Sequence, residues 1–277
     1  IATTANGFPD GLGSSADGTP TNMAANPTTT GKVGSYAWDF DGTNDYIQAG
    51  SVSNWKFLHD GSGGTIACWV KLDSKPTSED RDIITTHQDE STKKGVGIVL
   101  RRSSGSNGGF AVSINTETGT WRTVDHGVSA NINQWYYVVA TIQNGSTGLK
   151  LYVDGINVGS STFTSGYSGD SYQPLTFGRT DWNQNQTPWY YFDGKIDDVT
   201  VWNRALSASE ISTLYNSGSG LALNTQTAPE TNSIAVDTDT GVRRWFDGNM
   251  WIPIDSTRGV MAGGYNRSGS AYTNTID

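Results

Sequence analysis

The sequence predicts an all-β protein, an antiparallel β-sandwich that carries one short helix and a C-terminal hairpin extension. The chain has 34 glycines among 277 residues and only 16% charged residues, which suits short strands joined by tight turns. Apolar and polar residues alternate along residues 36–204, and Asp-Gly or Asn-Gly pairs interrupt the alternation. With 35% hydrophobic residues, the chain can fill one substantial core and a small further unit.

The strands follow an irregular lead-in, because residues 1–35 show little periodicity. Glycine supplies the positive φ that a two-residue hairpin turn requires, so neighbouring strands are predicted to pair antiparallel. The turns are expected at residues 41–42, 63–64, 107–109, 144–145, 154–155 and 193–194.

The strands within residues 36–47 and 194–207 both carry aspartates. The first and last strands of an all-β domain usually lie side by side, so Asp41, Asn44, Asp45 and Asp197 are candidate ligands for calcium. Calcium binds about six to eight oxygens, among them carboxylates and loop carbonyls. The alternative is structural: Asp41 makes its own turn, and Asp197 accepts backbone N–H groups at a strand end.

One helix is predicted to begin at Ser207, because Glu210 follows three residues later in a capping-box arrangement. Ile211, Leu214 and Tyr215 then form a single apolar stripe. We expect this short helix to sit against the end of the sandwich and residues 216–218 to close it.

The sequence changes character after Gly220. Residues 219–240 are predicted to be a linker or extended arm, and residues 241–277 a small β-hairpin unit in which Trp245 and Trp251 flank an Asp-Gly-Asn turn. A two-stranded hairpin is marginal alone in water, so its aromatic residues need a covering surface. That surface is the sandwich itself, a second copy of the chain or another protein. We expect self-association through residues 221–277.

Five stretches in this order and spacing resemble the laminin-G-like, concanavalin A-like jelly-roll family over residues 17–218. They are residues 36–47, 65–72, 135–141, 149–155 and 194–207. The resemblance implies a jelly-roll domain over residues 1–218, with its core from about residue 20, and a tendency to bind calcium and glycans in extracellular settings. It does not imply one activity.

The C-terminal hairpin and tail resemble segments of phage tail and virion-surface proteins. This resemblance implies a virion surface, such as a phage tail or capsid decoration, or another extracellular setting. The chain begins at Ile1 and ends in a Ser/Thr/Asn-rich run. We interpret it as a processed product or a piece of a longer polypeptide.

Charge and composition exclude several classes of function. The net charge of −9 argues against binding a nucleic-acid backbone, which needs a basic face. The sequence has no apolar stretch long enough to insert into a membrane. Cys68 is the only cysteine, so the chain has neither an internal disulfide nor a cysteine-based zinc site. Alternation places Cys68 on the same strand face as Ile66 and Val70, which predicts a buried, inert thiol.

The sequence does not predict an enzyme. Retaining glucanases of the jelly-roll family resemble one another in an E-x-D-x-x-E strand, and they need two carboxyl groups about 5 Å apart. None of the five glutamates has that spacing: Glu79, Glu90, Glu117, Glu210 and Glu230. Asp197 and Asp198 are adjacent, so on a strand they point to opposite faces. A glucanase-like hydrolase remains the least favoured alternative.

A loop between residues 181 and 191 has the composition of a sugar-binding site. Sugar recognition needs an exposed aromatic face for the C–H side of the ring and polar groups for its hydroxyls. The candidate glycan-binding residues are Trp182, Asn183, Gln184, Asn185, Trp189 and Tyr190. We therefore expect a non-catalytic structural or adhesion module that binds a glycan or cell-surface polysaccharide. The alternative is a decoration or assembly protein without a ligand, bound to other virion or surface proteins.

Overall fold

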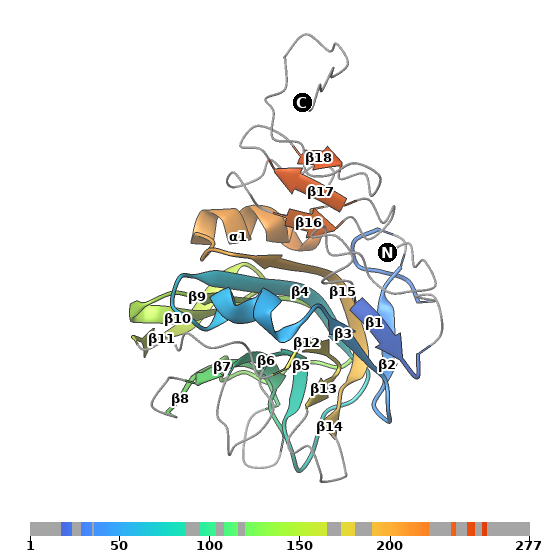
Figure 1. The fold of residues 1–277 in the computed structure, drawn as a ribbon. Coiled ribbons are helices and arrows are strands. Elements are labelled where there is room, and N and C mark those ends of the chain that lie inside the picture. Colours follow the sequence, from blue (N-terminus) through green and yellow to red (C-terminus); the bar gives the residue numbers. More distant parts are fainter. Residues whose placement is uncertain are drawn as a thin grey trace, which may run out of the picture.

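The computed structural model describes most of the jelly-roll region and a small part of the C-terminal segment. The described residues are 18–23, 29–34, 36–86, 95–103, 108–115, 120–164, 173–180 and 190–221, with the backbone alone for 234–236, 243–246 and 251–253. Within these ranges the chain forms two large antiparallel sheets packed face to face, as the sequence predicted (Figure 1).

The first sheet has six strands in the order β11-β10-β9-β4-β15-β2. The strands are β2 (Trp38–Asp41), β4 (Gly64–Leu72), β9 (Trp135–Ile142), β10 (Gly145–Val153), β11 (Ile156–Phe163) and β15 (Asp193–Trp202). The predicted neighbours β2 and β15 do pair, with Lys195 opposite Asp39. The start and the end of the jelly-roll region therefore meet at one edge of this sheet.

The second sheet has seven strands in the order β1-β3-β12-β5-β6-β7-β8. The strands are β1 (Gly18–Thr21), β3 (Tyr46–Ala49), β5 (Arg81–Thr85), β6 (Val96–Leu100), β7 (Phe110–Asn115), β8 (Trp121–Asp125) and β12 (Leu175–Phe177). A 3-10 helix, η1 (Val52–Leu58), follows β3, and a short hairpin of β13 (Arg179–Thr180) and β14 (Tyr190–Tyr191) follows β12.

The main core lies between the two sheets and consists of alternate residues of their strands. In β4 these are Ile66, Cys68, Val70 and Leu72. Cys68 is fully buried, and burial raises the pKa of its thiol, with the nearby Asp198 and Asp197 adding to the effect. The thiolate is the reactive form of cysteine, and the raised pKa disfavours it. The burial of Cys68 therefore agrees with the prediction of an inert thiol.

The outer face of the six-stranded sheet is covered by α1 (Ala208–Tyr215) (Figure 1). Ile211 and Leu214 of α1 form a second apolar cluster with outward residues of the sheet, among them Trp69 and Tyr137. The expectation that the helix sits against the end of the sandwich is wrong. Trp69 and Tyr137 point outward from the sheet and give its outer face an apolar surface. The apolar stripe of α1 packs on that surface.

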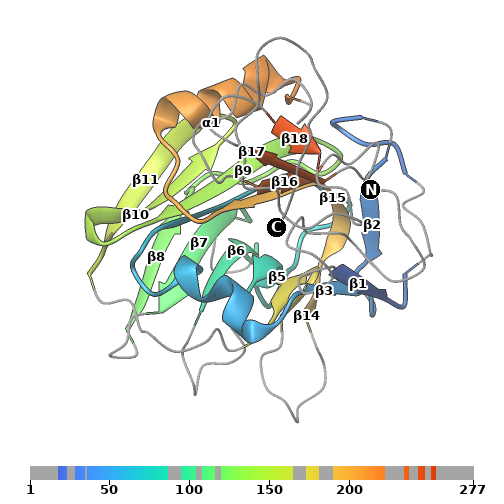
Figure 2. The ribbon, with the colours of Figure 1, turned by 45° about the horizontal axis from the view of Figure 1, so that its top comes forward.

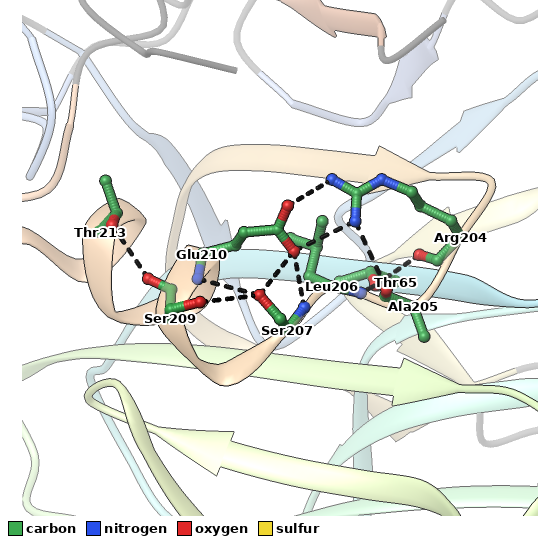
Figure 3. Close-up of polar contacts among 8 residues, drawn as sticks. All are labelled: Thr65, Arg204, Ala205, Leu206, Ser207, Ser209, Glu210 and Thr213. Carbon is green, nitrogen blue, oxygen red and sulfur yellow. Dashed lines mark hydrogen bonds and ion pairs between the residues drawn. The ribbon is translucent and has the colours of Figure 1, made fainter. Parts of the chain in front are cut away.

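The predicted capping box of α1 is confirmed. The Ser207 amide donates to Glu210 Oε2 at 2.7 Å, and the Glu210 amide donates to Ser207 Oγ at 3.3 Å. Arg204 Nη2 also reaches Glu210 Oε1 at 2.8 Å (Figure 3). Thr65 Oγ1 fixes the preceding turn to β4, because it donates to the Arg204 carbonyl and accepts from the Leu206 amide. Asn216 ends the helix with a φ of 48°, and η2 (Asn216–Gly218) follows.

The turn predictions are confirmed at one hairpin and overturned at another position. Asp154 and Gly155 join β10 to β11 with φ values of 52° and 77°, as a two-residue hairpin turn requires. Asp193 and Gly194 do not form a turn, because they lie inside the sheet at the start of β15, between β2 and β4. The Asp41-Gly42 pair does turn the chain, but it connects β2 to β3, which belong to different sheets.

The C-terminal segment contributes a separate three-stranded antiparallel sheet of β16 (Ile234–Val236), β17 (Arg243–Phe246) and β18 (Trp251–Pro253). β17 and β18 pair on either side of residues 247–250. β16 lies within the segment predicted to be a linker, and its backbone runs close to β15 (Figures 1 and 2). No helix in the described part of the chain is long and apolar enough to cross a membrane.

Candidate functional site

The predicted sugar-binding loop lies almost wholly outside the described residues. Trp182, Asn183, Gln184, Asn185 and Trp189 belong to residues 181–189, and only Tyr190 is described. The Arg81 guanidinium lies 5.0 Å from the centre of the Tyr190 ring. Burial lowers the pKa of Arg81. Tyr190 therefore has one ring face against a half-buried cation.

The β13–β14 hairpin holds the two ends of that loop together. Arg179 pairs with Tyr191, and Thr180 pairs with Tyr190. The Arg179 guanidinium lies 3.7 Å from the centre of the Tyr46 ring on β3. Because adjacent residues of a strand face opposite ways, the Arg81–Tyr190 and Arg179–Tyr46 contacts fix opposite faces of the hairpin.

Three of the four candidate calcium ligands lie together in the turn after β2. Asp41 Oδ1 accepts the Thr43 and Asn44 amides at 2.8 and 3.2 Å, and Asp45 Oδ2 accepts the Asp41 amide at 3.1 Å. Burial raises the pKa of Asp45, the Asp41 amide opposes the rise, and the charges of Asp41 and Asp39 add to it. These contacts match the structural alternative for Asp41, which was that it makes its own turn.

Asp197 lies apart from this turn. Asp193 is the residue of β15 opposite Asp41, and Asp197 is four residues further along, about 13 Å at the usual rise of a strand. Asp197 Oδ2 accepts the Lys32 and Val33 amides at 2.6 and 2.9 Å, and Oδ1 accepts the Asp198 amide at 2.8 Å. Burial raises its pKa to about 6, although these hydrogen bonds oppose the rise. Asp197 thus fixes the segment before β2 to the outer side of β15.

The described residues contain no group of three or more His, Cys, Asp or Glu side chains placed to hold a metal ion. Asp41 and Asp45 are the two carboxylates of the turn, with Asn44 beside them. A calcium ion bound there would need further oxygens from backbone carbonyls and water, because calcium takes about six to eight ligands.

A polar row that the sequence analysis missed crosses the outer face of the seven-stranded sheet. The inner residues of these strands, such as Ile98 and Val112, belong to the core, so their neighbours in each strand point outward. The strand registers align one outward residue from each of six strands. This outer row consists of Gln48, Thr176, Thr85, Gly97, Ser113 and Thr123.

The outer row is about 24 Å long at the usual spacing of about 4.8 Å between strands. Ser113 Oγ and Thr123 Oγ1 lie 3.1 Å apart in an exposed pair. Gln48 Nε2 reaches Thr176 Oγ1 at 3.5 Å. Thr176, Thr85 and Gly97 in the middle of the row are buried. Only the two ends, at Gln48 and at the Ser113–Thr123 pair, therefore offer polar groups to a ligand.

Asn115 follows Ser113 on the same face and has no side-chain hydrogen bond. Its side chain is fully buried, and neither Nδ2 nor Oδ1 has a partner. Its cross-strand neighbour is Trp121, which is half-buried. An unpaired buried amide costs about 1–3 kcal/mol of stability.

Two carboxylates on the same outer face, Asp82 and Asp125, lie too far apart to act as the carboxyl pair of a glycosidase. Asp82 and Asp125 belong to one row, with Val99 and Ala111 between them. Three strand spacings separate them, about 14 Å, whereas the carboxyl pair of a glycosidase is about 5–9.5 Å apart. Asp125 also lies 3.3 Å from Arg101 Nε. These two carboxylates therefore do not make a catalytic pair.

A sequence signal for the polar row was present but was not used. In β7, Phe110, Val112 and Ile114 alternate with Ala111, Ser113 and Asn115. Such alternation predicts one buried and one outward face. The sequence cannot show that Ser113 stands beside Thr123 and Gly97, because that depends on strand order and register.

Comparison with protein families supports the predicted resemblance. The Laminin_G_3 family model, described as the concanavalin A-like lectin/glucanases superfamily, matches residues 41–212. No curated protein matches this chain. The resemblance of the C-terminal hairpin to phage tail and virion-surface proteins stays a prediction.

Solved structures with a similar fold include a domain solved with a saccharide and a toxin binding domain. Domain 4 of AbnA, an extracellular arabinanase from Geobacillus stearothermophilus solved with arabinotriose, has a TM-score of 0.54 and 18% identity, covering 71% of this chain and 87% of that domain. The botulinum neurotoxin serotype D binding domain has a TM-score of 0.54 and 14% identity, covering 88% of this chain and 59% of that chain.

A third similar structure is that of botulinum neurotoxin type C, whose cell entry depends on interaction with two ganglioside molecules. It has a TM-score of 0.51 and 13% identity, covering 74% of this chain and 47% of that chain. This chain thus spans less than two thirds of either neurotoxin structure. Identities this low show a shared fold, which hosts different activities in different proteins.

Proposed function

Because the chain belongs to the concanavalin A-like lectin/glucanases superfamily, we propose that it is a non-catalytic module that binds a glycan. The outer face of the seven-stranded sheet is the proposed binding surface. The single observation that carries the proposal is the exposed Ser113–Thr123 hydroxyl pair at the end of the outer row, with the half-buried Trp121 on the same face of β8. Saccharides are recognised by several hydroxyl and amide groups beside an aromatic ring, and this surface offers both.

The similar solved structures favour a glycan as the ligand. One was solved in complex with arabinotriose, and the cell entry of another depends on gangliosides. The separation of Asp82 and Asp125 supports a binding role without catalysis.

The proposed setting is extracellular, on a cell or virion surface. The second candidate function is structural, with the chain as a decoration or assembly protein. It is favoured by the sheet of β16, β17 and β18, whose first strand runs along β15. In that case residues 221–277 mediate self-association or contact with other surface proteins.

Removing the exposed hydroxyl pair should weaken glycan binding. A Ser113→Ala, Thr123→Val double variant loses two hydrogen-bonding groups of the outer row, so affinity should fall about tenfold. A glycan array would identify the ligand, and isothermal titration calorimetry would compare the variants. Ser160→Ala, on the exposed edge strand β11, is the matched control and should bind like the wild type. Equal affinity of the double variant would contradict the proposed surface.

Calcium is the proposed cofactor, with Asp41, Asn44 and Asp45 as its ligands. An ion that binds only the folded chain raises the melting temperature by mass action. Calcium should therefore raise the melting temperature relative to a chelator, and Asp41→Asn should abolish the difference. Asp197→Asn should retain it, because Asp197 lies about 13 Å along β15 from the residue opposite Asp41. The same melting temperature in calcium and chelator would rule this cofactor out.

A further inference from the structure

We propose that β11 pairs with β11 of a second copy of this chain, so that two copies form a symmetric dimer through one edge of the six-stranded sheet. The strand β11 is the last of that sheet (Figure 2). Its one neighbouring strand in the described part of the sheet is β10. An edge strand presents unpaired N–H and C=O groups on its open side, and these groups are a template for another strand.

The other three edge strands of the two large sheets, as far as the chain is described, carry features that oppose such pairing. β1 contains Pro20, and β2 contains Asp39 and Asp41. β8 contains Arg122 and Asp125. All three have only four or five residues. Short length, charge and proline protect sheet edges in many proteins, whereas β11 has eight residues without a charge or a proline.

A bulge limits the pairing stretch to the second half of β11. Relative to β10, Val158 is an extra residue of β11, and a bulge of this kind bends its strand. Residues 159–163 follow without a further extra residue, and Ser160 and Thr162 among them are exposed. This straight, accessible stretch is the part of β11 that a second strand can join.

The two-fold axis of the dimer is placed at Ser160. Directly opposed residues of antiparallel strands point to the same face of a sheet, so the axis of a symmetric pair passes through one residue position. Ser160 has small neighbours on both sides, Gly159 and Ser161. The pairing sets Ser160 against its own copy and Gly159 against Ser161, which lets the two backbones approach.

A second copy fits this edge because the contact is neutral. Each chain has a net charge of −9, so two copies repel one another unless they meet through uncharged surfaces. A symmetric contact sets each residue near its own copy, and β11 brings no like charges together. The helix α1 contacts β11, and its exposed residues are uncharged as well: Ala208, Ser209, Ser212 and Thr213.

The dimer presents both proposed glycan-binding surfaces on the same side, a consequence that rests on the proposed function. The strand β8 lies against both β11 and β10, and a Cβ on Gly159 would come within 2.9 Å of Val124 on β8. A two-fold axis between antiparallel strands is perpendicular to the sheet, so the outer face of the seven-stranded sheet points the same way in both copies. Two such sites bind a glycan-coated surface more tightly than one, through avidity.

Ser160→Lys should weaken the dimer, because two lysines would then lie directly opposite each other. Lys150 of β10, opposite Ser160, adds positive charge on the same face. We expect the dissociation constant of the dimer to rise at least about fivefold, measured by sedimentation equilibrium on the full chain. Ser53→Lys, at an exposed position of η1, is the matched control and should dimerise like the wild type.

Mixing oppositely charged variants tests the position of the axis. Isotope-labelled Ser160→Lys chains should form mixed dimers with Ser160→Glu chains in native mass spectrometry, because opposite charges then face each other. These mixed dimers and the weakened Ser160→Lys dimer together support the pairing. A monomeric wild type, or a dimer that Ser160→Lys leaves intact, overturns it. In the second case residues 221–277 are the alternative contact, and their removal would dissociate the dimer.

Glycan binding separates this inference from the proposed function. In Ser160→Lys the apparent affinity for a glycan-coated surface should fall at least about tenfold, while the affinity for the same glycan in solution stays that of the wild type. Unchanged surface binding by a dissociated variant overturns the shared orientation of the two sites. Absence of glycan binding by a wild-type dimer overturns the proposed function and leaves the pairing of β11 standing.

Discussion

Replacing Gly194 with alanine should destabilise the sandwich by about 2–6 kcal/mol, through backbone strain and overpacking of about 1–3 kcal/mol each. Gly194 has a φ of +150°, which residues with a Cβ rarely adopt. A Cβ at this position would also overlap the Lys71 carbonyl of β4. Both costs arise because β15 runs between β2 and β4 at this point. Urea denaturation of the purified variant measures the loss.

Gly145 offers a matched control. Its φ is +152°, and a Cβ there would meet nothing within 4 Å. Gly145→Ala therefore carries the strain without the overlap and should lose only about 1–3 kcal/mol. If the two variants lost the same free energy of unfolding, the close approach of Gly194 to Lys71 would be contradicted.

Asp197 should make the protein less stable as the pH rises from about 4 to about 7. Burial raises the pKa of Asp197 from its ordinary 3.8 to about 6 in the folded chain, so the folded state binds more protons across this range. Stability is therefore greatest at low pH and falls as Asp197 ionises in the folded state. A rise in pKa from 3.8 to about 6 corresponds to about 3 kcal/mol. The cause is burial, which the three amide donors only partly offset.

Asp197→Asn should remove this fall, because the amide does not ionise. Denaturation of wild type and variant at pH 4, 5, 6 and 7 would give a difference in unfolding free energy that changes by about 3 kcal/mol over the series. Asp154→Asn is the comparison, because Asp154 is a half-buried carboxylate that accepts one amide, from Tyr137. In this variant most of the fall in stability between pH 4 and pH 7 should remain. Parallel pH profiles for wild type and Asp197→Asn would show that Asp197 is not the titrating group.

The elements that follow local rules were predictable. Ser207 and Glu210 satisfy each other's backbone amides within four residues, and Asp154-Gly155 has the turn chemistry of a hairpin. Cys68 is buried because alternation assigns it to the core face of its strand. Gly194 shows the limit of such rules: its positive φ was expected from Asp-Gly, but it allows close contact with β4 instead of a turn.

The candidate site was much less predictable. The predicted calcium site joins Asp197 to Asp41, but strand register places Asp193, not Asp197, opposite Asp41. Conversely, Ser113, Asn115 and Thr123 carry no motif. Ser113 and Thr123 come together on one face only when β7 and β8 pair.

By itself the sequence determined the all-β class and the capped helix at Ser207, because alternation, turn chemistry and capping act over a few residues. The pairing expected between the strands of residues 36–47 and 194–207 is that of β2 with β15. Only the tertiary structure decided that α1 covers the outer face of the six-stranded sheet and that six separate strands align the outer row. Strand order and register couple residues more than 100 positions apart, such as Gln48 and Thr176. No local pattern encodes that pairing, which depends on how the whole core packs.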